Sequence, residues 1–232
     1  MPRAEHAPAG FWPRAVAWLV DAAILGGIAC LLASSWMRGD VDALGMAWRG
    51  LGSTLGEAVR SSVERGEDAT TFMAAMLAAD SPLRLAIAGV IAAMRALAAP
   101  PLIAFIVLGL LYWPRLEAGA RGATIGKRLL GLRSASGNGE RLSSMRAFKR
   151  HLAGTLSWLT LNVGHLLAVG RPAHRALHDR IAGTQVLWRE DASRRVPWWG
   201  QVLLIVAVLV PLLLAVAAAM SLATAMQAAL GL

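Results

Sequence analysis

One carboxylate lies inside a long apolar segment of this chain. Asp21 interrupts the run from Ala15 to Ala33, and Arg14 precedes it by seven residues. Seven residues are almost two helical turns, so both side chains lie on the same stripe of a helix. An ionisable group at the centre of a membrane costs about 2.5–3.5 kcal/mol on insertion scales, and it persists where it faces a partner, a cavity or a site. Asp21 is therefore the candidate for binding a proton or a cation, with Arg14 tuning that site.

A histidine pair is the next candidate for chemistry. His174 and His178 are four residues apart, so on a helix they share one face, and Asp179 follows directly. Histidines at this spacing bind zinc, but the sequence offers no second cluster to complete four ligands and no HExxH pattern. We therefore expect no metal site, and we expect His178 and Asp179 to cap and hydrogen-bond a turn.

Enzymatic chemistry has no basis in the residues. The sequence contains no nucleophile elbow, no paired catalytic carboxylates and no Walker loop. We therefore expect a protein that is not an enzyme and that holds no cofactor. The basic stretch that begins at Thr124, Gly126 and Lys127 instead favours contact with anionic lipid at a membrane surface.

Composition indicates a membrane protein. The chain is 56% hydrophobic and 16% charged, with a mean hydropathy of +0.54, whereas soluble domains carry about 25% charged residues. The net charge of +9 is concentrated between the apolar runs, and no basic stripe is interleaved with aromatic residues. We therefore expect the lipid bilayer, and not a nucleic acid, as the partner.

Three apolar segments are long enough to cross the hydrocarbon core, which is about 30 Å thick. They run from about Phe11 to Trp36, from about Ala96 to Trp113, and from Val202 to Met220. The segment 153–170 is less apolar, and Asn162, Gly164 and His165 interrupt it. It either crosses the membrane or forms a re-entrant or interfacial hairpin.

The charges of the connecting segments predict the orientation. The segment 37–84 has five basic and seven acidic residues, whereas 114–150 has nine basic and two acidic residues. Because segments rich in Lys and Arg stay in the cytoplasm, 114–150 and the N-terminus are expected there, and 37–84 outside. The segment 171–195 is also basic. Both flanks of 153–170 then lie on one side of the membrane, which favours the hairpin.

Shorter elements complete the expected fold. Apolar residues at helical spacing from Leu44 to Val63 predict an amphipathic helix, and a second helix is expected over 70–79. The turn sequence Ser136–Gly139 predicts a short hairpin between 128–135 and 141–142, with which the strand-like segment 184–188 could pair. The predicted fold is an all-α membrane protein with three full transmembrane helices, a re-entrant or interfacial helical hairpin and a small cytoplasmic β-hairpin.

Three motifs in order along the chain carry a family resemblance. They are Gly10-Phe11-Trp12-Pro13-Arg14 with Asp21 seven residues later, Ala123-Thr124-Ile125-Gly126-Lys127-Arg128-Leu129-Leu130-Gly131-Leu132-Arg133, and His178-Asp179-Arg180-Ile181-Ala182-Gly183-Thr184. Together they resemble the RDD family of bacterial membrane proteins. The arginine and two aspartates that name the family would be Arg14, Asp21 and Asp179. Ile125 stands where the family usually has proline, and 37–84 is longer than the expected connection.

The resemblance implies a domain organisation and a function. It covers about residues 10–190, so we expect an N-terminal tail (1–10), an RDD-like membrane domain (11–190) with an insertion at 37–84, and an additional C-terminal transmembrane helix (191–232). The family is suspected of transport, including sodium–proton exchange for some members. The resemblance therefore implies transport of a small cation or solute, coupled to protons, in a bacterial inner membrane.

Each candidate residue has an expected role in that transporter. Asp21 binds the ion or proton, while Arg14, Asp179 and Arg180 form a supporting charge network. Thr124, Gly126, Lys127 and His178 belong to the cytoplasmic motifs. The alternative is a non-transporting scaffold or assembly factor held together by the Arg–Asp network. Partners would then be a second copy of the chain or other membrane proteins.

Overall fold

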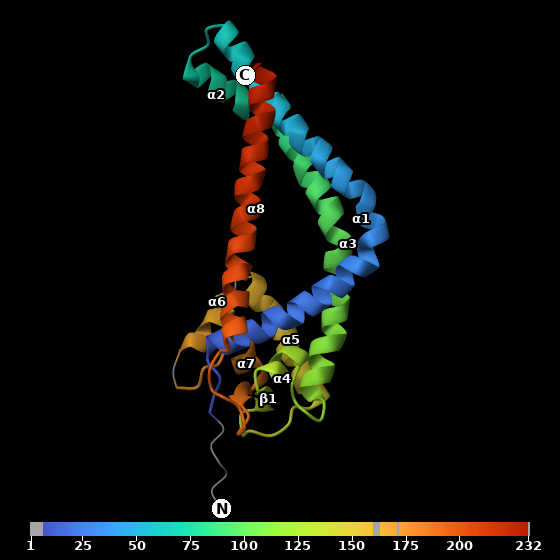
Figure 1. The fold of residues 1–232 in the computed structure, drawn as a ribbon, viewed down its shortest axis with the longest axis vertical. Coiled ribbons are helices and arrows are strands. Elements are labelled where there is room, and N and C mark those ends of the chain that lie inside the picture. The colour runs from blue at the N-terminus through green and yellow to red at the C-terminus, as the bar shows by residue number, and fades with distance from the viewer. Residues whose placement is uncertain (1–6, 160–162, 171, 232) are drawn as a thin grey trace, which may run out of the picture. The chain divides into compact units, whose positions relative to one another are not determined.

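The computed structural model describes residues 7–159, 163–170 and 172–231. Three of its helices are apolar and long enough to cross a membrane: α1 (Phe11–Glu64), α3 (Pro82–Ala118) and α8 (Trp198–Leu230) (Figure 1). They contain the three segments predicted to span the membrane. The all-α fold with three long apolar helices is therefore confirmed.

Helix α1 is longer than predicted. Its 54 residues give a length along the path of the helix of about 81 Å at 1.5 Å per residue, against about 30 Å for the hydrocarbon core. The predicted first span and the predicted amphipathic helix at 44–63 are one continuous helix. No proline occurs between Pro13 and Pro82, so nothing in the backbone interrupts the helix after Trp36.

The chain divides into two compact units. The first unit comprises residues 1–29 and 105–207, and the second comprises residues 30–104 and 208–232. The first unit holds the shorter elements between α3 and α8: α4 (Ile125–Leu129), β1 (Leu132–Ser136), α5 (Ser144–Leu159), α6 (Val163–Leu166), η1 (Leu167–Val169), α7 (Leu177–Ala182) and β2 (Thr184–Trp188). It also contains all the candidate residues of the sequence analysis.

A two-stranded antiparallel sheet lies in the first unit. Strands β1 and β2 pair in a register that sets Leu132 opposite Trp188 and Ser136 opposite Thr184. Leu132, Val186 and Trp188 are buried with Val16 and other residues of α1, so the sheet and α1 share a core. The strand at 184–188 is therefore confirmed.

The predicted local hairpin is wrong in its second strand. The turn after β1 forms, and the Gly139 N–H donates to the Ser136 carbonyl at 2.9 Å. However, 141–142 does not pair with β1: the Arg141 guanidinium donates to the carbonyl of Ala118 at 2.8 Å, and Leu142 packs on Ala118. β1 pairs with β2, which is the pairing that the sequence analysis allowed for 184–188.

The described residues of the segment 153–170 (153–159 and 163–170) lie in short helices, and Gly170 ends the last of them. Helices α5, α6 and α7 pack against one another, and among the described residues no helix of this segment qualifies as a fourth membrane span. This agrees with the predicted helical hairpin. The expected interruption at Asn162 lies outside the described residues.

The second unit pairs α1 with α8. The Trp48 indole N–H donates to the Ser221 hydroxyl at 2.9 Å, and the Arg60 guanidinium donates to the Ala229 carbonyl at 3.1 Å. Gly52 and Gly56 lie directly against Ala225 and Ala229. These small residues let the two backbones approach closely, as in other helix pairs with small residues every four positions.

Helix α2 (Ala69–Leu77) follows α1 in the second unit. The Asp68 carboxylate caps it, accepting the N–H of Thr70 at 2.8 Å and of Thr71 at 3.0 Å. The helix predicted at 70–79 is therefore confirmed, with its C-terminal end near the predicted position.

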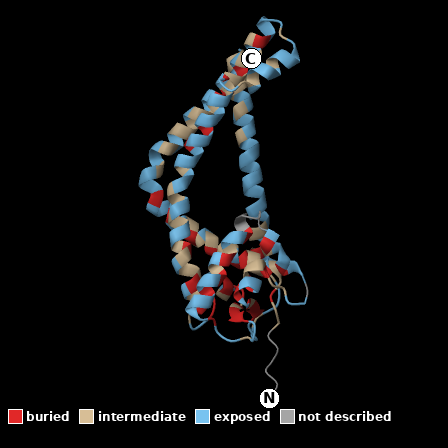
Figure 2. Ribbon diagram, turned by 180° about the vertical axis from the view of Figure 1, so that it is seen from behind, coloured by how far each residue is buried: buried red, intermediate tan, exposed pale blue. Residues whose placement is uncertain are grey.

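Apolar side chains cover the long helices on their outer faces. Figure 2 shows exposed residues along α3 and α8, whereas the buried residues gather around the short elements of the first unit. The exposed residues include Ile103 and Leu111 of α3 and Val208 and Leu213 of α8. An uncharged, exposed apolar surface of this kind suits contact with lipid acyl chains.

The close approach of α1 and α8 predicts opposite effects for two neighbouring glycines. A Cβ on Gly52 would lie 2.4 Å from the Ala225 Cβ, whereas a Cβ on Gly50 meets no atom within 4 Å. Gly52→Ala should therefore destabilise the detergent-solubilised protein by about 1–3 kcal/mol. Gly50→Ala should stabilise it by up to about 1 kcal/mol, because alanine favours the helix.

The two thermal midpoints, measured side by side in the same detergent, check this prediction. Equal midpoints, or a higher midpoint for Gly52→Ala, would contradict the observed packing of α1 on α8.

Candidate functional site

Asp21 is buried and hydrogen-bonded to uncharged groups. Its Oδ1 accepts the Tyr112 hydroxyl at 2.6 Å and the Gly126 N–H at 2.7 Å. The Tyr112 oxygen in turn accepts the N–H of Ile125 at 3.1 Å. Helices α1, α3 and α4 therefore meet at this one carboxylate.

Thr124 and Gly126 explain why α4 begins against α1. Thr124 is the N-cap of α4, and its hydroxyl accepts the Lys127 N–H at 3.4 Å. At Gly126, any Cβ would lie 2.0 Å from the Ala17 carbonyl oxygen of α1. Only glycine permits this contact, and the contact brings the Gly126 N–H to Asp21.

Asp179 is held between two guanidiniums. Its carboxylate forms ion pairs with Arg14 of α1 through Oδ2 and with Arg150 of α5 through Oδ1. Oδ2 also accepts the Ala176 N–H at 3.0 Å, and Oδ1 accepts the Thr184 hydroxyl at 3.2 Å. Asp179 thus caps the turn that begins α7, as predicted, and links α7 to two further helices.

Glu117 extends the ion pairs through α3. It pairs with Arg150 Nε at 3.0 Å and with the ammonium group of Lys127, which also donates to the Ser134 hydroxyl at 2.8 Å. Arg14, Asp179, Arg150, Glu117 and Lys127 therefore form a continuous series of alternating charges, which we call the charge network. It connects α1, α7, α5, α3 and α4.

Burial and these partners determine the protonation of the network. Burial alone would raise the pKa of Asp179, but Arg150 and then Arg14 hold it well below its usual range. Burial lowers the pKa of Lys127, and Glu117 opposes that change. Burial and the charge of Arg150 lower the pKa of His178 well below its usual value. His178 is therefore neutral at physiological pH.

The three buried carboxylates among the described residues of the first unit differ in their partners. Asp21, Glu117 and Asp179 are 1%, 4% and 0% exposed. Glu117 and Asp179 each pair with two cationic side chains. Asp21 forms no ion pair with any described residue, and the two hydrogen bonds that described residues donate to it both end on Oδ1. Among the described residues it is therefore the buried carboxylate that has no ion pair.

The expected pairings are realised in part. Arg14 contacts Asp179, not Asp21, and donates to the His174 carbonyl at 2.8 Å. Arg180 is exposed, and its guanidinium donates to the Arg175 carbonyl at 3.4 Å, so it lies outside the charge network. Arg150 occupies the position in the network that we expected Arg180 to take.

The two histidines do not share a helix. His174 precedes α7 with φ of 47°, and its Nδ1 lies 2.9 Å from the Ala168 carbonyl. The His178 Nε2 lies 3.2 Å from Arg150 Nη2. In the described part of the chain, no group of three or more His, Cys, Asp or Glu residues is arranged to hold a metal ion.

The sequence analysis missed Tyr112, Glu117 and Arg150. A signal existed for Glu117, because it is one of two acids among nine basic residues in 114–150. Arg150 stood within a basic stretch that we assigned to lipid contact. Tyr112 is the single tyrosine of the chain, and no sequence pattern links it to Asp21.

Comparison with known proteins adds a family match. The model of the RDD family matches residues 8–183, about three quarters of the chain. A curated relative, the "Uncharacterized protein YxaI" of Bacillus subtilis (strain 168), is 31% identical over 90 residues, which cover 39% of this chain. The aligned part spans 59% of that relative's length. No solved structure matches.

Arg150 is predicted to be a principal stabilising residue of the first unit. Arg150→Gln leaves Asp179 and Glu117 each with one cation, and breaking a buried ion pair costs about 3–5 kcal/mol. We expect a large fall in the thermal midpoint of the detergent-solubilised protein. Arg150→Lys should also destabilise it, because one ammonium group does not match the forked contacts of the guanidinium.

The neighbouring Lys149→Gln is the matched control. Lys149 is exposed, so its substitution should shift the midpoint little. A midpoint of Arg150→Gln equal to that of Lys149→Gln would show that the charge network does not stabilise the fold.

Proposed function

The chain belongs to the RDD family, and we propose that this integral membrane protein transports a small cation or solute, with Asp21 binding the ion or the coupled proton. The observation that carries the proposal is the environment of Asp21. It is buried, and no cationic side chain of the described residues forms an ion pair with it, although the charge of Lys127, which is itself paired with Glu117, acts on it at longer range. A buried carboxylate without such a partner is stabilised by a bound proton or a bound cation.

The contacts of Asp21 suit an exchangeable occupant. Both groups that contact it, the Tyr112 hydroxyl and the Gly126 N–H, donate to Oδ1. They stabilise the ionised carboxylate without neutralising it. Oδ2 accepts no hydrogen bond from the described residues, so a proton or a cation can bind there without displacing a protein donor.

Arg14 tunes this site at a distance. It lies seven residues from Asp21, about 10 Å along α1, and its guanidinium is engaged by Asp179 and the His174 carbonyl. In the proposal its positive charge acts on the occupant of the site across that distance, without occupying the site itself. Asp179 in turn fixes Arg14 and α7, so its role is to position the surrounding elements.

The charge pattern supports an orientation. Basic residues dominate 114–150 and 171–195, so we place these segments and the N-terminus in the cytoplasm of a bacterial inner membrane. Asp21 then lies on the cytoplasmic half of the first span. Three spans make a small pathway, and we propose that the transporter works as a homo-oligomer.

A scaffold is the second candidate, and the charge network favours it. Five fully engaged charges connect five elements of the first unit, as expected of a fixed framework. A non-transporting assembly factor would use that framework to present the second unit to other membrane proteins. In that case Asp21 would serve only to hold α4 against α1.

Proton flux into liposomes separates the two functions. The purified protein is reconstituted, and flux is recorded under imposed sodium, lithium and potassium gradients. Asp21→Asn keeps the size of the side chain but removes its charge, so cation-coupled flux should fall by about tenfold or more. Asp42→Asn is the control, because Asp42 is an exposed acid of the same helix.

The outcomes are distinct. Flux in the wild type and Asp42→Asn, but not in Asp21→Asn, is the expected result. A wild type that is folded but silent under all three gradients would exclude cation–proton exchange. Asp21→Asn that loses thermal stability and a co-purifying protein, with no flux in the wild type, would favour the scaffold.

A further inference from the structure

Helix α5 carries large apolar side chains on its outer face. They recur every three or four residues, which is the spacing of one helical stripe, and each is at least 40% exposed: Met145, Phe148, Leu152 and Leu156. We call these four residues the apolar stripe. The following short helices continue the exposed apolar surface with Val163, Leu166 and Val169. A surface of this kind marks a site of contact with lipid or with protein.

The inner face of α5 is small or polar instead. It packs within the first unit through four buried residues: Ala147, Arg150, Ala153 and Ser157. Gly164 of α6 is also buried, and it lies directly against Ser157. In a water-soluble domain the large apolar side chains of a helix face the core and its polar side chains face water. The inverted arrangement of α5 indicates that an apolar medium surrounds it.

The charged residues of α5 end after its first two turns. Arg146 and Lys149 are exposed there, whereas the sequence 152–170 contains no Asp, Glu, Lys or Arg. Thr155 is exposed beyond this boundary, and its hydroxyl donates to the Leu152 carbonyl at 2.6 Å. A hydroxyl that is satisfied by its own helix needs no water. The exposed surface of α5 therefore changes from one that suits anionic headgroups to one that suits acyl chains.

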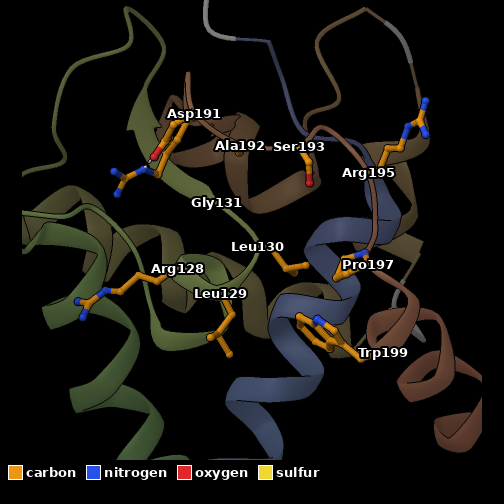
Figure 3. A pocket seen from close by; sticks show the side chains of 11 residues that line it. Arg128, Leu129, Leu130, Gly131, Asp191, Ala192, Ser193, Arg195, Pro197 and Trp199 are labelled. Atoms are coloured by element: carbon orange, nitrogen blue, oxygen red, sulfur yellow. Dashed lines mark hydrogen bonds and ion pairs between the residues drawn. The ribbon is translucent and has the colours of Figure 1, made fainter.

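The start of α8 has the same boundary. Arg194 and Arg195 are exposed before the helix, and no charged side chain follows in the sequence 196–232. A cavity of about 290 Å³ lies beside Trp199. In Figure 3 Arg195 and Arg128 point away from this cavity, on opposite sides of it. The exposed Arg195 therefore faces the surroundings of the protein, as expected of a basic residue at the level of the headgroups.

A lipid bilayer accounts for both boundaries, because headgroups and acyl chains follow each other along one direction. In Figure 1 helix α6 lies at the end of the first unit that is away from β1, with α5 and α7 between them. The uncharged short helices are therefore farthest from the sheet that we place in the cytoplasm. A contact with a second copy of the chain would not require the charged surface to end at the start of both α5 and α8.

We propose that α5 and α6 enter the membrane from its cytoplasmic side as a re-entrant pair, with the apolar stripe against acyl chains and with Arg146 and Lys149 beside anionic headgroups. This decides between the re-entrant and the interfacial hairpin. Met145 and Leu156 are eleven residues apart, or about 16 Å along α5, and half of the hydrocarbon core is about 15 Å thick. The proposal takes only the name of the leaflet from the proposed orientation, and it does not depend on transport at Asp21.

Depth measurements with nitroxide labels test the proposal in liposomes of phosphatidylglycerol and phosphatidylethanolamine. In the full chain carrying Cys30→Ser, one cysteine per variant is introduced and labelled: Met145→Cys, Leu152→Cys or Leu156→Cys. Collisions of the label with oxygen, which enters the acyl region, are compared with collisions with a water-soluble nickel chelate. We expect the oxygen-to-nickel ratio to rise in the order 145, 152, 156, because each position lies deeper than the one before.

Two exposed positions calibrate the ratio. Glu140→Cys, in the segment after β1, reports water, and Ile205→Cys on α8 reports acyl chains. The ratio of Leu156→Cys should match that of Ile205→Cys and exceed that of Glu140→Cys by about fivefold or more, because a polar chelate is excluded from hydrocarbon. All the replaced side chains are exposed, so the variants should fold like Cys30→Ser. Leu166→Cys supplies a second deep position should Leu156→Cys not fold.

Three results would overturn the proposal. Equal ratios for Glu140→Cys and Leu156→Cys would mean that the apolar stripe faces water. Few collisions with either reagent at 145, 152 and 156 would mean that protein covers the stripe, as in a contact between two copies of the chain. Equal depths at the three positions would mean that α5 lies flat at the membrane interface.

Discussion

The ion pairs of Asp179 with Arg14 and Arg150 are the interaction on which the first unit depends. Asp179 is fully buried, and its two oxygens join α7 to α1 and to α5. A buried carboxylate deprived of its cations is strongly unfavourable. The short helices around it bury few large side chains of their own, so the position of each depends on this charge pairing. Through Arg150 the pairing continues to Glu117 and Lys127.

The charge network ends beside the candidate ion site. Lys127 is its last member, and the preceding residue, Gly126, donates its N–H to Asp21. Helix α4 is therefore held by two adjacent residues: Lys127 pairs with Glu117 of the charge network, and the Gly126 N–H donates to Asp21. In the proposed transporter the buried carboxylates have two different roles. Glu117 and Asp179 hold the framework with permanent partners, and Asp21 remains for an occupant that can leave.

The sequence predicted the candidate residues better than their contacts. Hydropathy identified Asp21 and the three long helices, because an isolated charge in an apolar run can be recognised from the sequence alone. It did not predict that Arg150, 29 residues from Asp179, would bind it in place of Arg180, since periodicity says nothing about which distant charges meet. Strand β1 was expected to pair with 141–142 and with the strand-like segment 184–188. The pairing with 184–188 forms as β1–β2, whereas Arg141 and Leu142 contact Ala118 instead of β1.

Proton release on cation binding tests most directly whether Asp21 is the exchangeable site. Sodium, lithium or potassium is added to the purified protein in lightly buffered detergent, over a series of pH values, and a pH indicator records the protons released. A cation that takes the place of a proton on Asp21 should release up to about one proton per chain, and Asp21→Asn should release none. Equal release from Asp21→Asn, or no release from the wild type with any of the three cations, would contradict the assignment.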